Sequence, residues 1–259
     1  MSHIKNFLNH LWKEIRFQQL FDGAAVLSFY FFLSLFPLLF VFISMAGYLP
    51  LDEIGARNIE WWQEQVPPMI SNLIVTTLQE SLTPKSGGLI SVVSAVAVLL
   101  ASNGIAAVIR QLNSIYRVQH RRNFLLDRLY AIFLTLGFGA LTILPFWLDL
   151  KLGIEAGRSW LLGAFLFMAL IVIYYIGPHV RTKFRFTIPG ALFGAFLLVQ
   201  STKIFEAYIN NFSNYGILYG SLGAVTIMLI WLYLLGLLII CGGYINQALR
   251  MTLGFGEEV

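Results

Sequence analysis

A run of 43 residues without a lysine, arginine, aspartate or glutamate, from Ala207 to Leu249, constrains the fold of this chain more than any other feature. About 20 helical residues cross the hydrocarbon core of a bilayer, which is about 30 Å thick, so the run is too long for one span. Its first part, Asn210–Gly216, is rich in amide side chains and turn formers and predicts a loop. Non-helical backbone survives at membrane depth only where protein or water satisfies its amides, which makes residues 203–219 the most informative region.

The composition excludes a soluble globular protein. Hydrophobic residues make up 58% of the chain and charged residues 12%, with a mean hydropathy of +0.75. The single cysteine, Cys241, lies within the last apolar run, so the chain has neither a disulfide framework nor a cysteine-based zinc site. These values predict an integral membrane protein, and we expect no cofactor and no bound metal.

Apolar runs predict an all-α membrane protein with six transmembrane helices and a single membrane domain over residues 24–250. The predicted spans are 24–48, 86–109, 129–148, 159–180, 186–206 and 217–249. Residues 1–23 predict an amphipathic helix, which either lies on an anionic membrane surface or packs on the ends of the bundle. Residues 49–87, between the first two spans, predict a second amphipathic segment outside the membrane, and residues 251–259 a short tail.

The distribution of basic residues predicts the orientation of the six spans. Twelve lysines and arginines fall on the side of the two termini, five of them in a basic loop over 110–128, and five fall on the other side. The positive-inside rule then places both termini in the cytoplasm and residues 49–87 and 203–219 outside.

Several residues have the properties that helix packing in membranes requires. Pro37 predicts a kink in the first span, and small or hydroxyl side chains allow helices to approach closely. Those expected at helix contacts are Ser28, Ser34, Gly190, Gly194, Gly220 and Gly223.

Motifs in three parts of the chain resemble those of the YihY/BrkB family of bacterial inner-membrane proteins. The first span carries AAVLSFY at 24–30 and LSLFP at 33–37, and the basic loop carries QLNSIYR at 111–117. The C-terminal part carries Tyr208, Phe212 and Tyr215, then YGSLGAV at 219–225 and WLY at 231–233. The family commonly ends its last span with Gly-Ala-Glu, where this chain has Gly242-Gly243-Tyr244.

The resemblance implies a six-span fold in the bacterial inner membrane more firmly than it implies a reaction. The family has carried a ribonuclease label, an association with virulence or serum resistance, and suggestions of envelope-lipid transport. Metal-dependent RNA cleavage needs clustered histidine and carboxylate ligands. The four histidines, His3, His10, His120 and His179, show no such spacing, and we expect neither catalytic residues nor a nucleic-acid partner.

Polar residues near the outer end of the fifth span favour the transport of an envelope lipid or another amphiphile. Lys203 and Glu206 can pair on one helix face, and ionisable groups at membrane depth usually face a cavity or a partner. The residues expected to line an outward polar cavity for membrane lipids are Gln200, Lys203, Glu206, Asn210, Asn211, Asn214, Tyr215 and Tyr219. Alternatively, Lys203 and Glu206 only mark the interfacial end of the span. A membrane scaffold that docks envelope proteins through 49–87 or 110–128 is the second function that the sequence allows.

Overall fold

The described part of the protein consists of helices alone. The structure, a computed structural model, describes residues 17–46, 87–118, 124–152, 158–180, 182–211 and 215–253. These contain six α-helices and one 3-10 turn, and no strand occurs among them. The elements are α2 (Phe17–Ala46), α5 (Gly87–Ile115), α6 (Phe124–Leu152), α7 (Arg158–Ile176), η2 (Phe184–Phe186), α8 (Ile188–Asn211) and α9 (Tyr215–Leu253).

The six described α-helices overlap the six predicted spans, in the same order. Four stretches of the described chain are long and apolar enough to cross a membrane, and α7 contributes a shorter apolar stretch, Gly163–Ile176. The four stretches are Gln18–Leu38, Ala95–Ile115, Phe184–Phe205 and Val225–Thr252. The protein is therefore an all-α membrane protein, as predicted.

The helix bounds correct the predicted loops at two places. Residues 110–115 belong to α5 and residues 124–128 to α6, so the basic loop predicted over 110–128 is much shorter. In the segment Asn210–Gly216, predicted as a loop, both ends are helical, because α8 continues to Asn211 and α9 begins at Tyr215. Likewise α2 begins at Phe17, within the predicted amphipathic segment 1–23, and runs on without a break. The rest of that segment and residues 49–86 lie outside the described residues.

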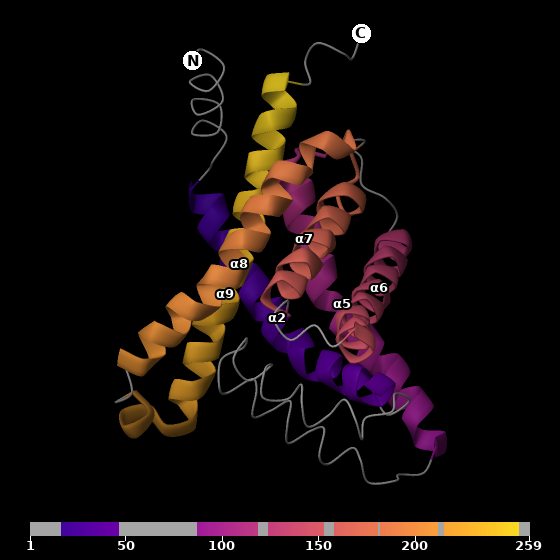
Figure 1. Ribbon diagram of the computed structural model, residues 1–259, viewed down its shortest axis with the longest axis vertical. Helices are drawn as coiled ribbons and strands as arrows, with labels where there is room; N and C mark the ends of the chain where they lie inside the picture. Colours follow the sequence, from indigo (N-terminus) through magenta and orange to yellow (C-terminus); the bar gives the residue numbers. More distant parts are fainter. Residues whose placement is uncertain are drawn as a thin grey trace.

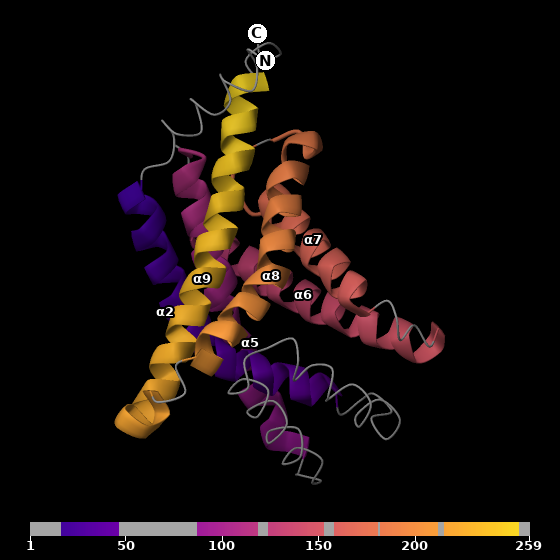
Figure 2. The ribbon, with the colours of Figure 1, turned by 60° about the vertical axis from the view of Figure 1, so that its left-hand side comes forward.

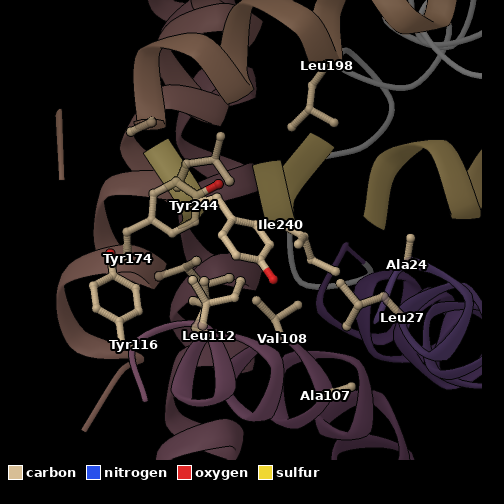
Figure 3. Close-up of a cluster of buried hydrophobic side chains, with 14 of the residues drawn as sticks. Ala24, Leu27, Ala107, Val108, Leu112, Tyr116, Tyr174, Leu198, Ile240 and Tyr244 are labelled. Atoms are coloured by element: carbon tan, nitrogen blue, oxygen red, sulfur yellow. The ribbon is translucent and has the colours of Figure 1, made fainter. Parts of the chain in front are cut away.

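The helices pack around a core to which five of them contribute. α2 packs against α5 and α9, α8 packs against α9 and α7, and α6 lies against α5 and α7 (Figure 1, Figure 2). The centre of the core contains Leu27, Leu112, Tyr174, Leu198 and Ile240, from α2, α5, α7, α8 and α9 (Figure 3). The helices therefore form one bundle with a shared core.

Apolar side chains also cover the outer faces of the helices. On α2 these are Val26, Phe29, Leu33 and Phe36, and on α6 they are Leu125, Leu129, Phe133 and Leu136. Residues three or four positions apart lie on one side of a helix, so each set forms an exposed apolar stripe. Such stripes suit contact with lipid tails, because a bilayer replaces water around the bundle.

Candidate functional site

Polar side chains from distant parts of the chain meet at one end of the bundle, where α5, α7 and α9 end and α6 and α8 begin. We call it the arginine-rich end, because Arg117, Arg185 and Arg250 lie there. The contacts described below join these helix ends to one another.

The end of α5 is fixed by its own backbone. The Val118 N–H donates to the Asn113 carbonyl at 3.0 Å and the Arg117 N–H donates to the Ser114 carbonyl at 3.2 Å. Together with the positive φ of 52° at Arg117, this pair of bonds is a Schellman motif. The motif ends the helix at Ile115 and places Tyr116 against the core, with 4% of its surface exposed.

A link between three elements lies beside this cap. The Asn113 Oδ1 accepts a hydrogen bond of 2.8 Å from the His179 backbone N–H, and its Nδ2 lies 3.5 Å from His179 Nδ1. The His179 Nε2 lies 3.0 Å from the Asp127 Oδ1. The link therefore joins α5, the start of α6 and the segment after α7.

The start of α8 is joined closely to α9. The Asn246 Oδ1 accepts a hydrogen bond of 2.8 Å from the Gly190 N–H. A Cβ atom at Gly190 would collide with the Gly242 carbonyl and with Asn246, and one at Gly242 would collide with the Tyr174 hydroxyl. That hydroxyl donates to the Ile239 carbonyl at 2.7 Å. Gly242, the first residue of the Gly242-Gly243-Tyr244 sequence, thus lies where α7, α8 and α9 approach one another closely.

Several buried polar atoms at this end have no hydrogen-bond partner. They are the Thr182 Oγ1 and both amide atoms of Gln247, whereas the Tyr116 hydroxyl and the Asn246 side chain lie within reach of each other. Asn246 and Gln247 are each 1% exposed. Burial raises the pKa of Tyr116 above its ordinary value, although the nearby Arg250 and a hydrogen bond from the Asn246 side chain act in the opposite direction. Tyr116, Tyr174 and Tyr244 all belong to the buried cluster that Figure 3 draws.

An arginine connects α5 and α6 nearer the middle of the bundle. The Arg128 Nη1 donates to Asn103 Oδ1 at 2.7 Å, and its Nη2 donates to the Leu99 carbonyl at 2.5 Å. Both guanidinium nitrogens thus have an acceptor on α5, which stabilises the positive charge of Arg128 between the two helices.

The residues predicted to line a polar cavity lie on α8 and α9, toward the opposite end. Lys203 is exposed and Gln200 is half-buried. Glu206, Asn210 and Asn211 belong to α8, and Tyr215 and Tyr219 to α9, but their side chains lie outside the described residues, as does Asn214. The predicted cavity and the pairing of Lys203 with Glu206 therefore stay predictions.

The residues predicted for helix packing lie as follows. Ser28 and Ser34 are buried and donate to carbonyls of their own helix, those of Ala25 and Phe31. Pro37 lies within α2. Gly190 contacts α9, a Cβ at Gly194 would lie 2.8 Å from Leu170, and Gly223 is buried. Gly220 lies on α9, and its surroundings are outside the description.

The sequence did not single out Tyr116, Asn246 or Gln247 as site residues. Tyr116 appeared only as part of the QLNSIYR motif, and Asn246 and Gln247 only as two adjacent amides near the end of a long uncharged run. For metals, no group of three or more histidine, cysteine, aspartate or glutamate side chains occurs among the residues that the structure describes.

Comparison with known proteins identifies a family over most of the chain. The model of the family described as Virulence factor BrkB matches residues 11–256. The putative ribonuclease-like protein YfkH of Bacillus subtilis is 32% identical over 275 residues, covering 98% of each chain. A UPF0761 membrane protein of Vibrio campbellii is 26% identical over 257 residues, covering 94% of this chain and 82% of the relative. No solved structure matches the chain significantly.

Proposed function

Because the chain belongs to the Virulence factor BrkB family of membrane proteins, we propose that it binds an anionic envelope lipid or similar amphiphile and transports it. The observation that supports this proposal is the position of Lys203 on α8. Its side chain is exposed next to Ile204, which is 67% exposed, and two turns after Phe196, which is 62% exposed. A lysine on such an apolar stripe is accessible to lipid.

The opposite side of α8 faces the bundle, where Ser201 and Phe205 are buried. Lys203 therefore lies away from the α8–α9 contact. A cation attracts an anionic headgroup more strongly where the dielectric constant falls, and the amides that follow in the chain can donate to phosphate or sugar oxygens. The acyl chains of the ligand then stay beside the apolar stripe.

The orientation that we propose places both termini in the cytoplasm of a bacterium and the protein in the inner membrane. Twelve basic residues on the side of the termini against five on the other support this orientation. Lys203 then belongs to the outer half of the protein, where it receives or releases an envelope lipid.

The lipid proposal is tested by the lipid that stays with the purified protein in native mass spectrometry. We expect Lys203→Ala to lose bound anionic lipid, Lys203→Arg to keep it, and Lys151→Ala, near the end of α6, to behave as the wild type. If Lys203 serves only to neutralise Glu206, Lys203→Ala lowers the melting temperature without changing lipid retention. Adding Glu206→Gln to that variant then restores the melting temperature. That result would contradict the lipid function and favour the scaffold, with partners docking on 49–87 or 110–128.

The name of the Bacillus relative raises ribonuclease activity as a question for this chain. We propose that the chain has no intrinsic ribonuclease activity, because its histidines and carboxylates are scattered along the sequence. Purified protein should leave labelled RNA intact with Mg²⁺, Mn²⁺ or Zn²⁺ present. Metal-stimulated cleavage that a single carboxylate substitution abolishes would show the opposite.

A further inference from the structure

We propose that Arg128 binds the headgroup of an anionic phospholipid on the lipid-facing side of the contact between α5 and α6. Two hydrogen bonds hold the guanidinium against α5, one from Nη1 to Asn103 Oδ1 at 2.7 Å and one from Nη2 to the Leu99 carbonyl. Lys203 lies on another helix, α8, and this site does not depend on the function proposed for that residue.

The positive charge of Arg128 is not neutralised by the protein around it. No carboxylate lies within ion-pair distance of Arg128 among the residues that the structure describes, and both of its acceptors, the Asn103 amide oxygen and the Leu99 carbonyl, are neutral. Asp127 is adjacent in sequence, but adjacent residues face different sides of a helix, and its Oδ1 lies 3.0 Å from His179 Nε2. A guanidinium has five N–H donors, of which these bonds use two, so three remain for a ligand.

The site is open on the side that faces away from the bundle. Arg128 is half-buried, and Leu125, one turn before it on α6, is 73% exposed. Leu99, whose carbonyl accepts from the guanidinium, is 42% exposed on α5. The other side of α6 is closed, because Ala131 and Leu134 are buried there. A lipid can therefore reach the guanidinium from the membrane while its acyl chains lie along the exposed leucines.

The depth of the guanidinium favours an anion from the membrane itself. Asn103 lies within the apolar stretch Ala95–Ile115, about three turns of helix before its end. A charge at membrane depth without a counter-ion is unfavourable, and the bilayer responds by thinning locally, which brings headgroups toward it. A phosphate offers two oxygens to a guanidinium in a bidentate geometry. A lipid with a net negative charge fits best, because no carboxylate pairs with Arg128 that could instead bind a choline group.

The test counts the lipids that stay bound to the full-length protein in native mass spectrometry, after extraction from nanodiscs with equal amounts of phosphatidylglycerol and phosphatidylcholine. We expect Arg128→Gln to bind phosphatidylglycerol at this site about tenfold more weakly, as for the loss of a contact between two charged groups. Arg128→Lys keeps the charge and should keep most of the binding. Lys203→Ala should leave this lipid in place, which separates the site from the proposed function.

Two control variants separate lipid binding from folding. Asn103→Leu breaks the same hydrogen bond as Arg128→Gln but keeps the cation, so it should lose stability and retain phosphatidylglycerol. Arg110→Gln removes an exposed arginine of α5 that lies beside Tyr30 instead, and it should bind as the wild type does.

A second measurement leaves Arg128 intact, in case Arg128→Gln does not fold. Benzoylphenylalanine in place of Leu125 should cross-link to phosphatidylglycerol in preference to phosphatidylcholine. The same group in place of Leu192, which is 60% exposed on α8, should show no preference.

Loss of phosphatidylglycerol in Arg128→Gln, with retention in Asn103→Leu and Arg110→Gln, supports the site. The proposal is overturned if the wild type retains both lipids equally, if Arg128→Gln binds as the wild type does, or if either control loses as much as Arg128→Gln. Displacement of the lipid by an equal concentration of soluble glycerol phosphate would also overturn it, because the site would then take a free anion.

Discussion

Gly190 is the residue at which the addition of a single methyl group should destabilise the protein most. A Cβ there would collide with the Gly242 carbonyl and with Asn246, which are held by the backbone of α9. We expect Gly190→Ala to lower the free energy of unfolding by about 1–3 kcal/mol, the usual cost of overpacking. Gly137→Ala is the control, since nothing lies within 4 Å of its Cβ position. Equal melting temperatures for the two variants would contradict the close contact.

At this scale the glycines carry a clearer signal in the sequence than the polar cluster does. The four-residue spacing of Gly190 and Gly194 is itself a packing signal. Tyr116 and Asn246 carry no such signal, because a tyrosine after a span and an amide near its end are as common on a surface as in a core. Their burial depends on contacts between α5, α8 and α9, which lie far apart in the sequence.

Among the elements, Arg128 adds two hydrogen bonds to the apolar packing of α6 on α5. We expect Arg128→Met to lower the free energy of unfolding by about 1–2 kcal/mol, because Asn103 and the Leu99 carbonyl lose a charged donor. Hydrogen exchange in α6 should become faster. The control is Arg110→Met, which also removes an arginine from the α5–α6 surroundings but breaks no hydrogen bond of this contact. The Arg110 side chain is exposed, and its guanidinium lies 4.8 Å from the Tyr30 ring centroid.

A double-mutant cycle with Asn103→Leu gives the decisive result for this contact. If Arg128 and Asn103 interact, the double variant loses less stability than the sum of the single variants. Strict additivity would show that the two side chains contribute independently.

The existence and order of the helices could be predicted, but their ends could not. Hydropathy indicates which residues suit the interior of a membrane. It does not locate the end of a helix, because a helix continues into water wherever its backbone hydrogen bonds are favourable. For this reason α5 extends beyond Arg110, where charge ended the predicted span. The same reasoning applies to Asn210 and Asn211, which the structure places in the last turn of α8 in spite of their preference for turns.

For the whole molecule, the main prediction concerns the two sides of the membrane. Single cysteines placed at Glu60 and at Gln119, with Cys241 replaced by alanine, should react with an impermeant reagent from opposite sides. The reason is the twelve-to-five asymmetry of basic residues. Labelling from the same side in intact cells and inverted vesicles would contradict the proposed topology.

The length of α9 has a consequence for the membrane around the protein. Its apolar stretch, Val225–Thr252, has 28 residues and as a helix is about 42 Å long, against a hydrocarbon core of about 30 Å. A tilt of about 20°, the average for membrane helices, shortens its span by only a few ångströms. We expect α9 to accommodate the remainder by reaching past the hydrocarbon into the headgroup region at the arginine-rich end, because its last two turns carry Asn246, Gln247 and Arg250.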